Sequence, residues 1–220
     1  MFKNKWVLYL GFFGLLVLGF WLFVFKGTDK WKKKSPILTY VQPFAFKNQD
    51  GIRFTNQDML GKVNVVEFFF TTCKGICPNM NSNMLKVYNR FKSYPDFQIV
   101  AHTCDPDRDS VPVLKKYADS LGIDTHKWVF LTGRKDSLYK QARVSYLLDD
   151  PKNELKDVAS DFIHTQFFAV VDKNGRVRGQ IFDGLKTADL QKLENLVQRL
   201  LDEPAEQTNF VNGIFNNNPQ

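Results

Sequence analysis

The chain has 220 residues, 44% of them hydrophobic and 15% aromatic, which is enough for one globular domain with a hydrophobic core and an additional segment. Seven lysines and one aspartate fall within residues 1–34, so most of the formal net charge of +7 lies there and the remainder is nearly neutral. This distribution excludes the broad basic surface by which proteins bind nucleic acids. Three cysteines are too few for a disulfide-stabilised scaffold.

The first predicted element is a membrane anchor at residues 6–25, which are apolar and uncharged. At ~1.5 Å per residue, a helix of this length reaches roughly the ~30 Å of a bilayer core. Trp6, Tyr9 and Trp21 lie near its ends, where aromatic rings favour the membrane interface. No small-x-small cleavage site follows the segment, so we expect a retained anchor and not a cleaved signal peptide.

The lysines around this segment predict its orientation. Two lysines precede it and five follow it before residue 35. By the positive-inside rule, this count favours a cytoplasmic location for the rest of the chain. The expected organisation is a flank at 1–5, the anchor at 6–25, a basic linker at 26–36, a globular domain at 37–202 and a disordered tail at 203–220.

The globular domain shows alternating strand and helix signals. An opening hairpin around Asn48–Gly51 precedes two strand–helix units, and a second hairpin around Asp172–Gly175 precedes a final helix. This order predicts an α/β fold of the thioredoxin-like kind, with a mixed central sheet and helices on both faces. After the first hairpin, the expected strands are 63–70, 97–103, 128–131, 166–171 and 176–182, and the expected helices are 81–91, 111–121, 136–144 and 188–201.

Cys73 and Cys77 follow the buried strand at 63–70 and precede a helix. Backbone N–H groups and the helix dipole at such a turn lower thiol pKa values, and thiolates bind soft metals and attack disulfides. Three residues separate the thiols, against two in the familiar redox motif. Zinc would need four ligands, whereas Cu(I) accepts two or three soft donors. The turn therefore predicts thiol redox chemistry or a sulfur-ligated metal.

Further candidate residues lie outside this turn. His164 follows a long irregular stretch and could be a third donor or an ordinary hydrogen-bonded histidine. The acidic stretch 105–110 is not a calcium loop, because Ser110 replaces the required glycine and Lys116 the terminal glutamate. We expect Asp109 or Ser110 to cap the following helix. We expect Cys104 to be a small buried residue, with a third redox thiol as the alternative.

These segments together resemble the Sco/SenC family of membrane-anchored, thioredoxin-like copper proteins that serve cytochrome c oxidase assembly. The resemblance covers roughly residues 40–200. Cys104 departs from it, because a valine or isoleucine is usual there. The matching stretches are Gly61-Lys62, the Phe-rich strand followed by TTCKGICP at 71–78, DPDRD at 105–109, WVFLTG at 128–133, His164-Thr165 and DKNG at 172–175.

The resemblance implies that Cys73, Cys77 and His164 bind Cu(I) or Cu(II), with Asp105 close to the site. It also implies a single-pass anchor in the inner membrane with the domain in the periplasm or an equivalent extracytoplasmic space, which is the opposite side from the one that the lysine count favours. The implied partner is the copper-bearing subunit of the oxidase or another copper chaperone. The chain would be mainly a metallochaperone. Two alternatives remain: a thiol–disulfide oxidoreductase with Cys73 and Cys77 as catalytic residues, and a membrane-tethered sensor of copper or redox state.

Overall fold

The computed structural model describes residues 5–25, 35–73, 75–149 and 165–205. The chain divides into two compact units, residues 1–35 and 36–220. His164, most of the basic linker and most of the C-terminal tail lie outside the described residues, as does Lys74 between the two thiols.

The first unit contains the helix α1 (Lys5–Phe25), which confirms the predicted apolar helix to within one residue. Residues Lys5–Phe23 are long and apolar enough to cross a membrane, and none of that stretch is buried in protein. Large apolar side chains such as Phe12, Phe13 and Phe20 are exposed around the helix. A helix with this surface is a candidate transmembrane segment, because a soluble helix would carry a polar face.

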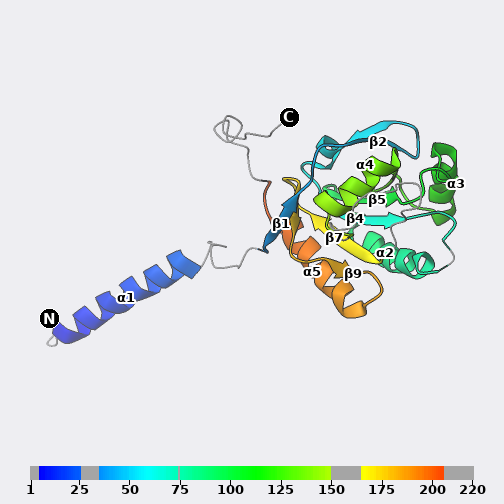
Figure 1. Ribbon diagram of the computed structural model, residues 1–220. Coiled ribbons are helices and arrows are strands. Elements are labelled where there is room, and N and C mark those ends of the chain that lie inside the picture. Colours follow the sequence, from blue (N-terminus) through cyan, green and yellow to red (C-terminus); the bar gives the residue numbers. More distant parts are fainter. Residues whose placement is uncertain (1–4, 26–34, 74, 150–164, 206–220) are drawn as a thin grey trace. The chain divides into compact units, whose positions relative to one another are not determined.

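The second unit is built on one mixed sheet (Figure 1). The strand order is β1-β8-β7-β4-β5-β6-β2-β3, with β9 paired to β7. The three central strands β4, β5 and β6 run parallel, and the others pair antiparallel. The strands are β1 (Ile37–Tyr40), β2 (Ala45–Asn48), β3 (Arg53–Thr55), β4 (Val63–Phe69), β5 (Phe97–Thr103), β6 (Trp128–Thr132), β7 (Phe167–Val171), β8 (Arg176–Arg178) and β9 (Phe182–Asp183).

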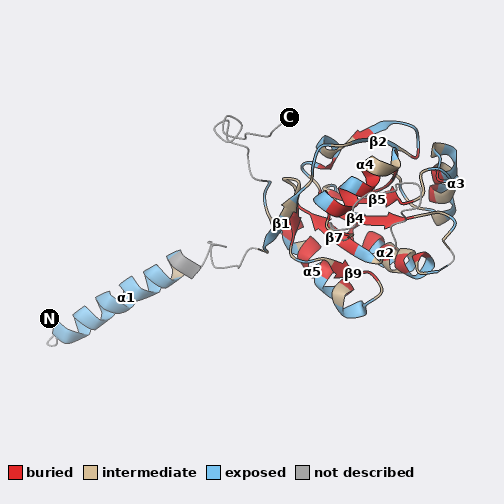
Figure 2. Cartoon of the chain, in the orientation of Figure 1, coloured by how far each residue is buried: buried red, intermediate tan, exposed pale blue. Residues whose placement is uncertain are grey.

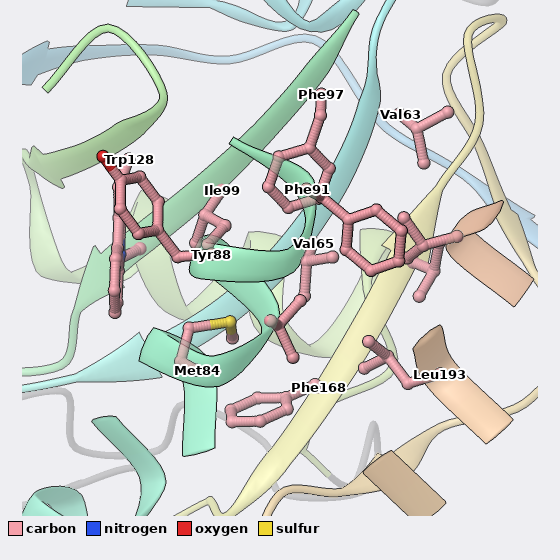
Figure 3. Close-up of a cluster of buried hydrophobic side chains, with 14 of the residues drawn as sticks. Val63, Val65, Met84, Tyr88, Phe91, Phe97, Ile99, Trp128, Phe168 and Leu193 are labelled. Carbon is pink, nitrogen blue, oxygen red and sulfur yellow. The ribbon is translucent and has the colours of Figure 1, made fainter. Parts of the chain in front are cut away.

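Helices cover both faces of this sheet, and the side chains of β4 alternate between two hydrophobic clusters. Val65 and Phe69 belong to the cluster beneath α2, α3 and α5, which Figure 3 shows in part. Val66 and Phe68 belong to the cluster beneath α4. The helices are η2 (Asn56–Met59), α2 (Cys77–Phe91), α3 (Val111–Leu121), α4 (Lys135–Lys140) with its π-helical continuation η3 (Gln141–Ser145), and α5 (Thr187–Asp202).

Burial follows this layered arrangement. All seven residues of β4 and all seven of β5 are buried, as Figure 2 shows for the centre of the sheet. Strands that are buried on both faces carry continuous apolar runs, which explains why the run at 63–70 was recognisable in the sequence. The predicted thioredoxin-like α/β fold is therefore confirmed.

Several element boundaries differ from the sequence prediction. Helix α2 begins at Cys77 instead of Asn81, because Pro78 fits the first helical turn, where its missing N–H is not needed. The predicted strand 176–182 is divided into β8 and β9 at Gly179, whose φ is +83°. The short strand β1, which pairs with β8, was not predicted.

Candidate metal and thiol site

The thiol turn, residues 70–77, connects the end of β4 to the start of α2. The N–H of Cys73 donates to the carbonyl of Phe70 at 3.3 Å, so the chain turns immediately after the strand. Cys77 is the first residue of α2, and Ile76 is its N-cap residue. Cys73 is half-buried, whereas Cys77 is only 6% exposed. The structure thus places both thiols at the start of a helix, one accessible from solvent and one beneath it.

Their surroundings shift the two pKa values in opposite directions. Partial burial raises the pKa of Cys73, but hydrogen bonds from the Cys77 thiol and from backbone N–H groups of the turn outweigh burial, so that the pKa is lowered overall. Burial, the hydrogen bond to Cys73 and the charge of Cys73 raise the pKa of Cys77 to about 12. Cys73 is therefore the thiol that ionises first, and Cys77 keeps its proton.

Cys104 and Asp105 lie at the end of β5, next to the end of β4. The Cys104 N–H donates to the Phe69 carbonyl at 2.7 Å, which extends the pairing of β4 with β5. Cys104 is 2% exposed, and burial raises the pKa of its thiol, followed by the charges of Cys77 and Asp109. The predicted small buried residue is confirmed. Asp105 is half-buried, and its carboxylate lies 3.7 Å from the guanidinium of Arg108.

The described histidines are not placed as donors to these thiols. His102 is buried beneath α4 against Phe68, with its ring centroid 5.0 Å from that ring, and burial lowers its pKa to about 3. His126 is exposed and precedes β6, at the opposite edge of the parallel strands. His164, the predicted third ligand, lies outside the described residues.

The described residues of the thiol turn offer two sulfur donors to a metal ion, Cys73 and Cys77. Across residues 5–25, 35–73, 75–149 and 165–205, no group of three His, Cys, Asp or Glu side chains could hold a metal ion. Cys73 and Cys77 lie close enough to shift each other's pKa values, and two adjacent soft sulfurs suit Cu(I), which accepts two donors. The described part of the site fits Cu(I), and a third donor would have to come from elsewhere.

Asp109 has a role that the sequence analysis missed. Ser110 occupies the N-cap position of α3, one of the two residues predicted there, but its side chain makes no capping hydrogen bond, and the Asp109 carboxylate accepts hydrogen bonds from Thr71 and Thr103 instead. Both carboxylate oxygens of Asp109 accept hydrogen bonds from the threonines at the ends of β4 and β5, so this side chain does not cap the helix. Thr71 follows the end of β4 and Thr103 is the last residue of β5, two strands that the sequence did predict, and this was the available signal.

Glu67 is a second unpredicted feature, in the middle of β4. Its side chain is fully buried, and neither carboxyl oxygen makes a hydrogen bond of ordinary geometry to a described residue. Burial raises the pKa of Glu67 to about 8, although the indole N–H of Trp128 lies close enough to lower it slightly. Glu67 shares the face of Val65 and Phe69, beneath α2 and α3. The carboxyl is therefore uncharged at neutral pH.

A mixed sheet with a thiol pair at the turn between a central parallel strand and a helix defines a thioredoxin-like thiol protein. Residues 32–200 match the profile of the SCO1/SenC family, and the chain belongs to that family.

The relatives agree with this assignment. The SCO1 protein homolog of Bacillus subtilis is 33% identical over 146 residues, covering 66% of this chain and 74% of that protein. The solved structure of BsSco, described with a disulfide switch and as a member of the Sco family of cytochrome c oxidase assembly proteins, is 28% identical with a TM-score of 0.62, covering 77% of this chain and 98% of that one. Yeast Sco1 with copper bound is 26% identical with a TM-score of 0.54, covering 73% of this chain and 89% of that one.

Proposed function

We propose that this protein is a membrane-anchored copper chaperone that helps to assemble the dinuclear copper site of cytochrome c oxidase. The observation that carries the proposal is the pair Cys73 and Cys77, two free thiols at a helix start, of which Cys73 is half-buried and Cys77 is buried. Copper is the cargo, and a partner would take it by exchanging its own ligands for these sulfurs. The Sco relatives support this proposal, because one is described with bound copper and another as an oxidase assembly protein.

His164 is proposed as the third copper ligand and Asp105 as a residue beside the site. A neutral imidazole added to two thiolates would allow the site to hold Cu(II) as well as Cu(I). Asp105 lies in the loop after β5, and its charge, like those of Cys73 and Cys77, acts on the buried Cys104. The acidic side chain and the thiols therefore occupy the same edge of the sheet, where an anion favours a bound cation.

The proposed location follows from α1. Residues 6–25 would anchor the chain in the inner membrane, residues 26–36 would form the linker and residues 37–202 the copper-binding domain in the periplasm, followed by the tail at 203–220. The five lysines after the anchor favour the cytoplasm instead. Labelling of an engineered cysteine in the linker, in intact cells, with a thiol reagent that does not cross the membrane would decide the side. Protection from the reagent would reject the periplasmic location.

A thiol–disulfide oxidoreductase is the second candidate, favoured by the opposite pKa shifts of the two thiols. A thiol with a lowered pKa attacks a partner disulfide, and the buried neighbour then resolves the mixed disulfide. The sensor alternative has no comparable observation in its favour. The partner in either reaction would be a copper-bearing oxidase subunit or another copper chaperone.

The test is an anaerobic copper titration of the reduced full-length protein in detergent, followed by absorption spectroscopy. We expect one equivalent of Cu(II) to give sulfur-to-copper charge-transfer bands that vanish in Cys73→Ser. If the protein retains neither Cu(I) nor Cu(II), and the Cys73–Cys77 pair is readily oxidised to a disulfide and reduced again, the chaperone function is rejected and the oxidoreductase function is supported.

A further inference from the structure

Asp109 is a buried carboxylate at the base of the thiol turn. Its exposed fraction is 0%, and within the described part of the chain no lysine or arginine forms an ion pair with it. A buried charge without a counter-ion is costly unless hydrogen bonds replace the lost water. The role of Asp109 should therefore be sought in the groups to which its carboxylate is hydrogen-bonded.

Three donors satisfy the carboxylate of Asp109. The hydroxyl of Thr71 donates to Oδ1 at 2.5 Å, and the N–H of Thr71 lies 3.2 Å from Oδ2. The hydroxyl of Thr103 donates to Oδ2 at 2.5 Å. We call Asp109, Thr71 and Thr103 together the Asp109 clasp. Hydrogen bonds to a charged acceptor are the stronger ones in proteins, so the clasp fixes both threonines firmly.

The clasp joins two segments that the proposed site requires. Thr71 lies two residues before Cys73 in the thiol turn. Thr103 ends β5, and while its hydroxyl donates to Asp109 it also accepts the N–H of Asp105 at 2.9 Å. The carbonyl of Asp105 in turn accepts the N–H of Asp109 at 2.8 Å. One network of hydrogen bonds thus runs from the thiol turn to the acidic loop.

We propose that Asp109 is a positioning residue that fixes the thiol turn against the end of β5 and so sets the geometry in which Cys73 and Cys77 bind copper. This inference rests on the proposed copper function. A carboxylate is suited to the task because two oxygens can accept several bonds at once from two strands. Residues that orient metal ligands in this way change metal affinity by about 10-fold to 100-fold when they are replaced.

The test uses the reduced full-length protein in detergent with two variants of the clasp and two controls. Thr71→Val removes the donating hydroxyl with little change of shape, and Thr71→Ser restores it. Asp109→Asn removes the charge, and Asp107→Asn removes the charge of an exposed neighbour in the same loop. Cu(I) affinity is measured by competition with a chelator, and the Cu(II) site by its charge-transfer spectrum.

We expect Thr71→Val and Asp109→Asn each to weaken Cu(I) binding by about tenfold or more and to shift the charge-transfer bands. The Thr71→Ser and Asp107→Asn proteins should match the wild type. The double variant Thr71→Val/Asp109→Asn should bind no more weakly than Asp109→Asn alone, because both changes break the same contact. Unchanged affinity and spectrum in a folded Thr71→Val protein would overturn the positioning role.

A second measurement separates this proposal from the copper function. If the wild type retains no copper, the proposed function fails, and the clasp is then tested by amide hydrogen exchange in the metal-free protein. The amides of Thr71 and Cys73 should exchange slowly in the wild type and in Thr71→Ser, and at least about tenfold faster in Thr71→Val and Asp109→Asn. Equal exchange in all four proteins would overturn the clasp itself.

Discussion

The buried carboxyl of Glu67 makes the stability of the domain depend on pH in an unusual direction. The pKa of this group is 4.5 in its ordinary state and about 8 in the fold, because burial penalises the charged form. Between these values the folded protein holds a proton that the unfolded chain has released. Stability is therefore greatest below the lower pKa and is lost as the pH rises towards 8, the reverse of a salt-bridged carboxylate.

The size of the effect follows from the pKa difference. Each pKa unit corresponds to ~1.4 kcal/mol, so keeping Glu67 protonated costs about 3 kcal/mol of unfolding free energy at pH 7. Glu67→Gln keeps the shape and removes the ionisation. The free energy of unfolding of the variant, relative to that of the wild type, should increase by ~1.4 kcal/mol per pH unit between about pH 5 and pH 8, and then level off.

The assay is urea unfolding of residues 36–220 at several pH values with the thiols reduced. This unit contains both hydrophobic clusters and a single tryptophan, the fully buried Trp128, whose fluorescence reports on the core beside Glu67. The control is the variant Asp107→Asn at an exposed position, and its free energy of unfolding should depend on pH in the same way as that of the wild type. A difference between Glu67→Gln and the wild type that stays constant with pH would refute the reasoning.

Other predictions concern the site and the sheet. With an alkylating reagent at neutral pH, mass spectrometry should find Cys73 modified well before Cys77, because the pKa of Cys73 is lowered and that of Cys77 is raised; equal rates would contradict the assigned asymmetry. Cys77→Ser should abolish tight copper binding, and retention of high affinity would argue against a two-sulfur site. His164→Ala should weaken mainly Cu(II) binding, so an unchanged Cu(II) titration would remove His164 from the ligands. Gly179→Ala should lower the free energy of unfolding by about 1–3 kcal/mol in denaturant titrations, since its φ is +83° and an added Cβ would lie 2.7 Å from a side chain of α5; wild-type stability would show that the backbone relaxes.

Much of the fold could be predicted because its central elements carry strong local patterns. The strand β4 is a mainly apolar run rich in Val and Phe, and α3 was predicted at its observed bounds, Val111–Leu121. The strand β1 was missed because it is four residues long and exists through pairing with β8, more than a hundred residues away. The division of the last hairpin depends on Gly179, whose left-handed backbone angle is visible in the structure alone.

The candidate site shows the same division between local and distant information. The thiols could be recognised because strand, turn, cysteines and proline are consecutive in the sequence. The Asp109 clasp could not, because Thr71 and Asp109 are 38 residues apart. They meet because β4 and β5 pair in parallel with Phe69 opposite Thr103, a register that no local pattern specifies.

Because β4 is paired on both edges, it limits which backbone segments of the site can move. When two sulfurs form a disulfide or close around a metal, the backbone must absorb the change in their separation. All seven residues of β4 are buried, the strand is paired with β5 and β7, and Thr71 is hydrogen-bonded to Asp109. The backbone from β4 to Thr71 is therefore held in place. The deformation is left to Thr72, Cys73 and the first turn of α2, so changes in NMR chemical shift on disulfide formation or metal binding should be larger there than in β4.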